Sequence, residues 1–393
     1  MIPRYNPTYT FSDLYTSLKI SYQRSEDVNA ALAARIADLY KTKHVFLVDS
    51  GRSALYLLLK AYDRPGGVLF PAYTCRVVPE AVRYSGYDPI LLDVDENSFN
   101  LPLESIRRAV TPKITVCLAT HLLGMPTNVL EMKDLLKGSG VLLVEDAAPA
   151  MGAEIDGKLV GTFGDAAILS FHVAKAVSGE TGGAILTNRD DLAEGISAFL
   201  AAASPPEPKG FYTQFVRAFL RKLISLPSLY STVHRTYRTL QKETMYELVP
   251  LALELPADYL RQCSRFSSSL ILAQMDRLVF NMARRRKLAS IYQNETKKIP
   301  WLRVPPLTDG CAPAWLQYSI FTEDKWGFYK YMQSNGIDLS WTYRYSCAES
   351  LEINGFPNSK RAAQSVLGLP TYPSLTDQQA EKIVYFARNY SRS

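Results

Sequence analysis

Two ionisable residues in the first half of the chain are placed where an aldehyde cofactor with a basic ring nitrogen could use them. Asp146 ends one apolar run, and Lys175 follows another by a few residues. A lysine amine can form a Schiff base with the aldehyde of pyridoxal phosphate (PLP), and a carboxylate can keep the ring nitrogen of PLP protonated. Most lysines are solvated, and an aspartate at a strand end can simply cap a helix, so the pair alone does not decide the chemistry.

Residues 27–200 alternate between helical patterns and short apolar runs. The runs predict strands at 45–48, 67–70, 89–94, 114–119, 141–144, 166–171 and 183–187. Short continuous apolar runs separated by helices indicate strands buried on both faces, so we predict a mostly parallel sheet covered by helices. Ligands of such sheets bind at the carboxyl ends of the strands, which is where Asp146 and Ser170 fall.

The run Ser50-Gly51-Arg52-Ser53 begins a predicted helix directly after the first of these strands. Backbone N–H groups and the positive end of the dipole make a helix N-terminus an anion site. Gly51 lets the backbone approach a phosphate closely, while the serine hydroxyls and Arg52 can donate further hydrogen bonds. A plain N-cap formed by Ser50 explains the same residues without a ligand, and the two interpretations are compatible.

Composition narrows the class of protein. A chain of 393 residues is long enough for two or more domains with a large core, and a formal charge of +6 fits a small anionic substrate without indicating nucleic-acid binding. Five scattered cysteines and four histidines predict neither a disulfide framework nor a metal site. Because we find no apolar run of 18 residues and no secretory signal, we expect a cytoplasmic protein.

A segment at about 203–260 interrupts the alternation. Between residues 211 and 242 it has six lysines or arginines, no acidic residue, and apolar residues at helical spacing. This pattern favours a helix that packs on a partner subunit and has a solvated basic face. The alternatives are a lid over an anionic substrate and a peripheral membrane contact through residues 211–242. Helical patterning resumes at 267–294, and its basic run at 284–287 is also expected to be a solvated face.

Further motifs occur in a fixed order over nearly the whole chain, and together they resemble the DegT/StrS type of PLP-dependent sugar aminotransferases. The most specific is Ser170-Phe171-x-x-x-Lys175 followed by Gly182-Gly183-Ala184. The other matching segments are 50–55, 71–74, 121–126, 145–148, 161–165, 356–358, 361–363 and 367–373. Each segment alone is a weak signal, whereas their order and spacing together are specific.

The resemblance implies the aspartate-aminotransferase-like fold (fold type I), an α/β fold with a mostly parallel sheet flanked by helices and a smaller C-terminal α+β domain. It implies that Lys175 forms the Schiff base and that Asp146 pairs with the pyridine nitrogen. The further cofactor-binding residues that it implies are Gly51, Arg52, Ser53, Tyr73, Cys75, Ala148 and Ser170. We place a large PLP-binding domain at 1–265, which includes the insert, and a long helix with a small domain at 266–393.

The same resemblance implies transfer of an amino group from an amino acid, usually L-glutamate, to a nucleotide-linked keto-sugar in glycan or polysaccharide biosynthesis. It also implies a homodimer with shared active sites. His172, Tyr343 and Arg344 are candidate substrate contacts, although packing beside the cofactor or a surface position would explain them as well. Two alternatives remain: another PLP-dependent modification of a sugar, and a non-catalytic PLP-binding regulator.

Three positions depart from the family's pattern. Pro149 stands where the family often has glutamine, and Cys75 stands where an aromatic ring often stacks on the cofactor. Cys263 replaces an asparagine that reaches the phosphate of the partner subunit. These positions lie on the substrate side or at the subunit contact, so we expect retained PLP binding with an unusual substrate.

Overall fold

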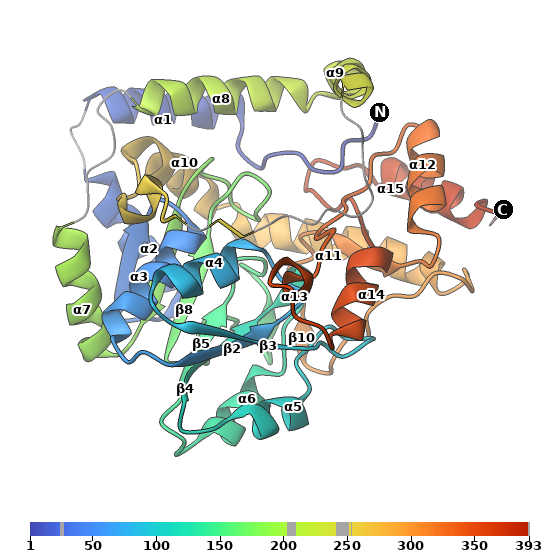
Figure 1. Cartoon of the computed structure of the whole chain (residues 1–393). Coiled ribbons are helices and arrows are strands. Elements are labelled where there is room, and N and C mark those ends of the chain that lie inside the picture. The colour runs from blue at the N-terminus through green and yellow to red at the C-terminus, as the bar shows by residue number, and fades with distance from the viewer. Residues whose placement is uncertain (24–26, 203–209, 241–250, 253, 392–393) are drawn as a thin grey trace.

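The computed structural model describes residues 1–23, 27–202, 210–240, 251–252 and 254–391, apart from the side chains of 235–240. Its centre is a seven-stranded sheet between two layers of helices (Figure 1). In spatial order the strands are β1 (His44–Val48), β9 (Gly183–Thr187), β8 (Ala166–Ser170), β5 (Leu142–Asp146), β4 (Ile114–Thr120), β2 (Gly67–Pro71) and β3 (Asp88–Leu92). The five strands from β8 to β3 are parallel, and only β9 runs against its neighbours. The prediction of a mostly parallel sheet is confirmed.

The two faces of the sheet carry separate cores because successive side chains of a strand point to opposite faces. In β2, Leu69 packs into one core while Val68 and Phe70 pack into the other. The helices that contribute to the first core are α2 (Val28–Tyr40), α5 (Leu103–Ala109), α6 (Val129–Leu136), α10 (Arg265–Met275) and the start of α11 (Leu278–Thr296). Those of the second are α3 (Gly51–Tyr62), α4 (Val77–Tyr84), α7 (Asp190–Ala201) and α13 (Cys347–Ser350). Burial on both faces explains why the strands read as continuous apolar runs.

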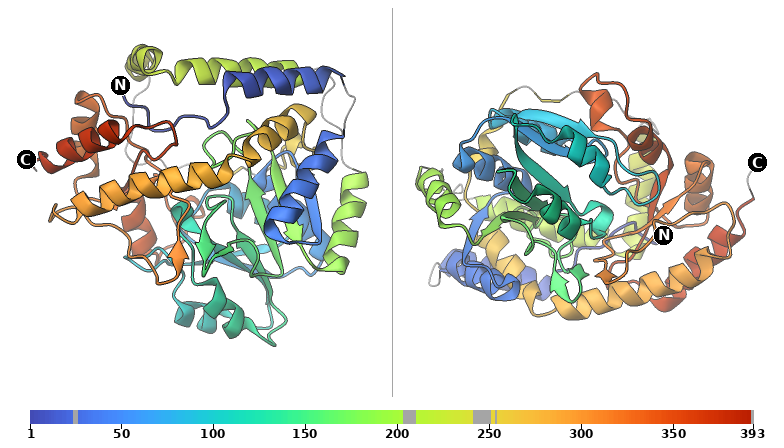
Figure 2. Two further views of the ribbon diagram at one scale, coloured as in Figure 1. Left: turned by 180° about the vertical axis from the view of Figure 1, so that it is seen from behind. Right: turned by 90° about the horizontal axis from the view of Figure 1, so that it is seen from below.

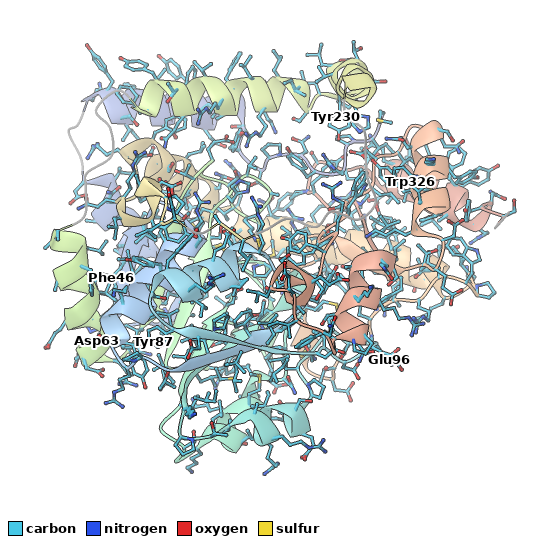
Figure 3. All side chains as sticks on the ribbon, viewed as in Figure 1. Phe46, Asp63, Tyr87, Glu96, Tyr230 and Trp326 are labelled. Carbon is cyan, nitrogen blue, oxygen red and sulfur yellow. The ribbon has the colours of Figure 1, made fainter. Side chains whose placement is uncertain are left out.

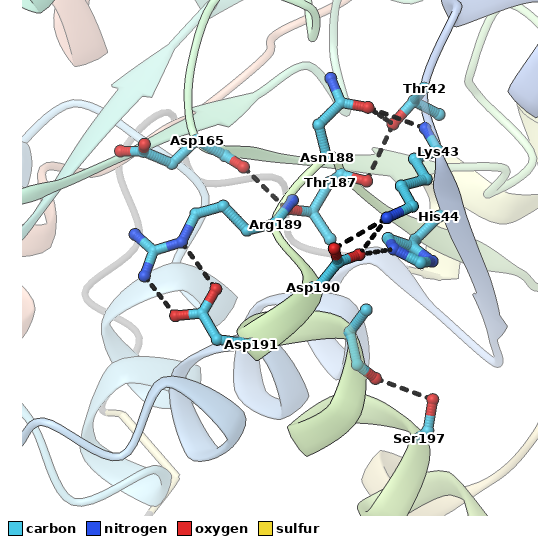
Figure 4. Close-up of polar contacts among 11 residues, drawn as sticks. Thr42, Lys43, His44, Asp165, Thr187, Asn188, Arg189, Asp190, Asp191 and Ser197 are labelled. Atoms are coloured by element: carbon cyan, nitrogen blue, oxygen red, sulfur yellow. Dashed lines mark hydrogen bonds and ion pairs between the residues drawn. The ribbon is translucent and has the colours of Figure 1, made fainter.

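The outer edge of the sheet is tied to the start of α7 by polar side chains (Figure 4). Lys43 Nζ lies 2.6 Å from one Asp190 oxygen, and His44 Nε2 lies 2.7 Å from the same oxygen. The Thr187 hydroxyl donates to the Asp165 carbonyl at 2.8 Å. These contacts hold β1, β9 and α7 together at the edge away from the strand ends that carry Asp146 and Ser170.

The helical pattern at 267–294 is two helices rather than one. α10 ends at Met275, and α11 begins at Leu278. The basic run at 284–287 in α11 is also not a solvated face. Arg285 is 3% exposed and donates to the backbone carbonyls of Trp315 and Leu316, while Arg286 pairs with Glu154 at 2.8 Å. The prediction of a solvated face is wrong there because α11 crosses between the sheet and the C-terminal elements.

The C-terminal elements form a smaller α+β unit around a third core. A two-stranded sheet pairs β11 (Tyr318–Phe321) with β12 (Val366–Leu369). The helices around it are α12 (Lys325–Ser334), α14 (Pro357–Ser365) and α15 (Asp377–Arg388). Beside the main sheet, β6 (Glu154–Ile155), β7 (Lys158–Leu159) and β10 (Cys311–Ala312) make a short three-stranded sheet.

A separate helical layer covers the side of the molecule where the catalytic candidates lie. α1 (Phe11–Gln23) and α8 (Gly210–Ile224) run side by side, and α9 (Pro227–Leu240) follows at the end nearer the C-terminal unit (Figures 1 and 2). Tyr230 of α9 donates its hydroxyl to the buried Asp338 of the C-terminal unit, on the same side of the molecule as Trp326 (Figure 3). The insert is therefore helical over most of 210–240, while its proline-rich beginning at 205–208 and residues 241–250 lie outside the described residues.

Candidate active site

The residues predicted to do chemistry meet in one cavity of about 790 Å³ at the carboxyl ends of β5 and β8. Those that line it are Gly51, Arg52, Cys75, Asp146, Ala148, Ser170, His172, Lys175 and Tyr343. They come from the start of α3, the segment before α4, the ends of β5 and β8, and the segment before α13. An amine, a carboxylate and a helix N-terminus thus face one shared space.

Lys175 lies in a tight turn after β8. Its backbone N–H donates to the His172 carbonyl at 2.9 Å, and its side chain is half-buried. Burial lowers the pKa of the Lys175 amine below its ordinary value, and the nearby Asp146 and Cys75 oppose this change only in part. The amine is therefore neutral more readily than a surface lysine, and a neutral amine is what attacks an aldehyde or accepts a proton.

Asp146 is the last residue of β5, and its side chain is buried at the base of the cavity. The Ala148 N–H donates to Asp146 Oδ1 at 3.1 Å. Burial raises the pKa of Asp146, while Lys175 and this N–H act in the opposite direction. A cation placed against the carboxyl, such as a protonated ring nitrogen, would hold it ionised because opposite charges attract strongly out of water.

Behind Asp146, a buried pair fixes the end of β5. Glu145 accepts hydrogen bonds from the backbone N–H groups of Gly161, Phe163 and Gly164, at 2.6–2.8 Å. Its other contact is His121 Nε2 at 3.0 Å, and the Thr127 N–H donates to His121 Nδ1, so Nε2 carries the proton. Burial alone would raise the pKa of Glu145, but these hydrogen bonds lower it. The motifs at 121–126 and 161–165 therefore support the strand end that presents Asp146.

The start of α3 is built as expected for a helix that receives an anion. Ser50 caps it by accepting from the Ser53 N–H at 3.2 Å. Gly51 faces Ser170 so closely that an added Cβ would lie 2.9 Å from the Ser170 Cβ. Arg52 pairs with Asp258 and stacks over the Tyr259 ring at 5.2 Å. The backbone N–H groups thus remain the principal donors toward the cavity.

Three of the predicted residues do not line this cavity. Ser53 is buried, and its hydroxyl contacts the Ser50 hydroxyl at 2.8 Å. Tyr73 is buried between Phe99 and Tyr343, with ring centroids 5.6 and 5.4 Å away. Arg344 stacks over the Trp341 ring at 4.9 Å. The side chains of all three are thus engaged in packing or hydrogen bonds away from the cavity.

The three positions that depart from the family's pattern fall in different places. Cys75 and Pro149 line the cavity, whereas Cys263 is buried and contacts the Ser268 hydroxyl at 3.3 Å. Two of the three departures thus face the space that a cofactor and substrate would share.

Residues that were not predicted as part of the site enter it from α8 and from the loop after Lys175. Gln214, Arg217 and Arg221 of α8 line the cavity, together with Glu180. Arg217 is exposed while it lines the cavity, whereas Arg221 is partly buried and pairs with Glu180, so the basic face of the insert is solvated at Arg217 and engaged at Arg221. The spacing of the two arginines by four residues was the available signal, since it puts both on one face of a helix.

The residues present fit PLP. Lys175 and Asp146 lie in one cavity, the α3 N-terminus would hold the phosphate, and the close approach of Gly51 to Ser170 leaves that helix start without a side chain in the way. Ala148 would lie against a ring face. Bound PLP supplies an aldehyde and an electron-withdrawing ring, and this fold and site define a PLP-dependent transferase.

Comparison with known proteins identifies the family. The model of the DegT/DnrJ/EryC1/StrS aminotransferase family matches residues 14–229 and 238–387, so the chain belongs to this family of PLP-dependent enzymes. The fold agrees with that of Helicobacter pylori PseC, an aminotransferase involved in the biosynthesis of pseudaminic acid. That structure superposes with a TM-score of 0.78, at 16% identity, over 98% of this chain and 97% of the other.

Two curated relatives are named for nucleotide-linked amino sugars. GDP-perosamine synthase of Vibrio cholerae is 23% identical over 90% of this chain and 88% of its own length. A dTDP-3-amino-3,6-dideoxy-alpha-D-galactopyranose transaminase of Aneurinibacillus thermoaerophilus is 24% identical over 91% of this chain and 88% of its own length. Within the described residues, no helix is both long and apolar enough to cross a membrane.

Proposed function

We propose that the protein transfers an amino group from an amino acid, L-glutamate in the first instance, to a keto-sugar carried on a nucleoside diphosphate. The observation that carries the proposal is that Lys175 and Asp146 line one cavity that the arginines of α8 also line. The named relatives support it, because both act in the formation of nucleotide-linked amino sugars. The pathway context that we propose is glycan or polysaccharide biosynthesis.

Each of the site residues has a separate role in the proposed reaction. Lys175 Nζ, with its lowered pKa, would take the proton from the reacting carbon of the donor and later return a proton to the reacting carbon of the acceptor. Asp146 would hold the ring nitrogen of bound PLP protonated, and His121 and Glu145 keep the end of β5 in place. The α3 N-terminus would hold the phosphate of PLP and so keep the reacting atoms within reach of Nζ.

We also propose a homodimer as the working form, as in the family generally. The exposed apolar residues on the outer side of α8 and α1 support this part of the proposal.

The test is the absorbance spectrum of the purified protein with PLP, before and after L-glutamate is added. We expect a visible band from the lysine-bound cofactor that bleaches with L-glutamate. Lys175→Ala should lose both the band and its response, whereas Lys158→Ala, a surface lysine on β7, should keep both.

A band that no amino acid bleaches would contradict amino transfer and favour a non-catalytic PLP-binding role. A band that bleaches, followed by a sugar product without nitrogen, would favour another PLP-dependent modification. Loss of the band in Lys158→Ala would mean that Lys175 is not the residue that carries the cofactor.

A further inference from the structure

Helix α8 turns a polar face toward the cavity, although most of its residues are apolar. Gln214, Arg217 and Arg221 are three and four residues apart, so they lie on one side of the helix, and all three line the cavity with Lys175. Val216 and Leu220 lie on the opposite side and are about half exposed, at 51% and 49%. An ordinary surface helix turns its apolar face inward, so the polar face of α8 is placed to contact a molecule that enters the cavity.

Arg221 is held in place by the loop that carries Lys175. Its Nη1 lies 3.1 Å from Glu180 Oε2, and the Tyr9 hydroxyl donates to Glu180 Oε1 at 2.6 Å. Glu180 and Tyr9 are both buried. The following residue, Lys222, donates from Nζ to the Pro7 carbonyl at 2.9 Å. The helix is thus fastened over the cavity, and the guanidinium of Arg221 is oriented before any substrate arrives.

Arg217 lies one turn away and forms no ion pair with any residue whose side chain is described. It lines both the main cavity and an adjoining cavity of about 660 Å³ that also includes Arg261 and Arg265. The carboxylates of the two cavities are Asp49, Asp146, Glu180 and Asp258. Asp258 pairs with Arg52, and Glu180 pairs with Arg221 at 3.1 Å while it also feels the charge of Arg217. The exposed guanidinium of Arg217 can therefore still donate hydrogen bonds to an anion that enters the cavity.

His172 lines the same cavity as Lys175, Arg217 and Arg221. Partial burial, together with the charges of Lys175 and Arg221, lowers the pKa of His172 to about 4, so a neutral imidazole stands beside the amine. The cavity of about 790 Å³ has room for a sugar ring beside the reacting groups.

We infer that Arg217 and Arg221 form the subsite for the diphosphate of the nucleotide-sugar acceptor. This inference rests on the proposed function. The donor's carboxylate is attached directly to the carbon that reacts and must lie beside Lys175, whereas the diphosphate is separated from the reacting carbon by the sugar ring. Two guanidinium groups on adjacent turns can each make paired, charge-assisted hydrogen bonds to phosphate oxygens.

The experiment measures binding rather than turnover. GDP, UDP and dTDP are titrated by calorimetry into the PLP-loaded full-length protein, and the tightest of the three becomes the probe. We expect Arg217→Gln and Arg221→Gln each to weaken its binding roughly 10- to 100-fold, as loss of hydrogen bonds to a charged group does. Arg107→Gln, which removes an exposed arginine on α5, should bind as the wild type does.

Arg217→Gln is the decisive variant because Arg217 is exposed and has no role in fastening the helix. Its melting temperature and its bleaching by L-glutamate should match those of the wild type, and Arg217→Lys should recover part of the binding. Unchanged binding in Arg217→Gln, or no binding of any of the three probes to the wild type, would overturn the inference. Lost bleaching with diphosphate binding intact would also overturn it and would assign the arginines to the donor's carboxylate.

Failure of the proposed function would look different. In that case the wild-type protein would bind the diphosphate through Arg217 and Arg221, but no amino acid would bleach the cofactor band.

Discussion

Among the described residues, burial lowers the pKa of three lysines, Lys175, Lys222 and Lys325, and of these Lys175 lines the cavity. Lys325, at the start of α12, is 3% exposed and donates to the Ala363 carbonyl at 2.7 Å. Burial lowers the pKa of Lys325 to about 7, and the charge of Arg344 adds to the effect. A cation is unfavourable both when it is buried and when it lies at a helix N-terminus. Protonated Lys325 therefore lowers the stability of the fold.

We predict that Lys325→Met stabilises the protein and weakens the dependence of stability on pH. The folded pKa of about 7 lies below the unfolded value of 10.5, so the unfolded state binds more protons between these values. The wild-type free energy of unfolding should therefore rise with pH from about 7 to 10.5. The difference between the folded and unfolded pKa values corresponds to about 5 kcal/mol of unfolding free energy. The hydrogen bond to Ala363 that Lys325→Met loses subtracts roughly 1 kcal/mol from this gain.

Urea unfolding at pH 6 and at pH 9 checks this prediction. The advantage of Lys325→Met over the wild type should be largest at pH 6 and should shrink at pH 9. Lys330→Met, at an exposed position of the same helix, should show no such trend. An advantage that is the same at both pH values would mean that Lys325 does not titrate in this range.

A second prediction at the residue scale separates Gly51 from Ser53. Gly51→Ala should weaken PLP binding by about tenfold or more, because the new Cβ would lie 2.9 Å from the Ser170 Cβ and displace the helix start. Ser53→Ala should have a smaller effect, since its hydroxyl bonds to Ser50 rather than facing the cavity. Equilibrium titration with PLP measures both, and a larger loss in Ser53→Ala would contradict the assignment.

At the scale of elements, the sheet is predictable because its strands are buried on both faces. The prediction for 114–119 matches β4 at Ile114–Thr120, and that for 183–187 matches β9 at Gly183–Thr187. The prediction that fails concerns residues whose surroundings depend on long-range contacts. The run at 284–287 reads as solvated from its composition, yet Arg285 is surrounded by carbonyl groups from residues 30 or more positions away. No local pattern reports such partners.

The residues of the candidate site also differ in whether a local sequence pattern predicts them. Local motifs indicate Gly51, Asp146 and Lys175, because a helix start and strand ends carry their own sequence signals. Glu180 carries none, since its role follows from Tyr9, 171 residues earlier, and from Arg221 on the insert. The insert's position over the cavity is equally a matter of packing, and the composition of residues 211–242 left the lid, the subunit contact and the membrane contact open.

The contact between α8 and the loop after Lys175 gives a prediction at this scale. Glu180→Gln removes the buried negative charge that orients Arg221, so we expect α8 to separate from the loop more often. Hydrogen exchange should then be faster in 211–224 by about tenfold, with little change in α6. Tyr9→Phe keeps the charge and loses one hydrogen bond, so its effect should be smaller. Equal exchange rates in Glu180→Gln and the wild type would show that other contacts hold the helix.

At the scale of the whole molecule, the outer surface of the α1–α8 layer raises the question of what covers it. Its exposed large apolar side chains include Tyr15, Tyr22, Tyr212, Val216, Phe219 and Leu220. Exposed apolar side chains on two neighbouring helices indicate an interaction site. The cations of α1 and of the described part of α8 are Lys19, Arg217, Arg221 and Lys222, of which Arg221 pairs with Glu180 and Lys222 bonds to Asn6. Few cations thus remain to attract anionic lipid headgroups, and we propose that a second copy of the chain covers this surface.

We predict a dimer of the 44.0-kDa chain in solution that this surface maintains. Light scattering after size exclusion should give twice the chain mass, and the double variant Val216→Asp/Leu220→Asp should give the monomer mass, because two buried charges facing their copies would be costly. Val279→Asp/Phe280→Asp, on the exposed side of α11, is the matched control and should remain dimeric. A monomer from the α11 variant alone would place the interface there. A wild-type monomer that floats with anionic vesicles would restore the membrane interpretation of residues 211–242.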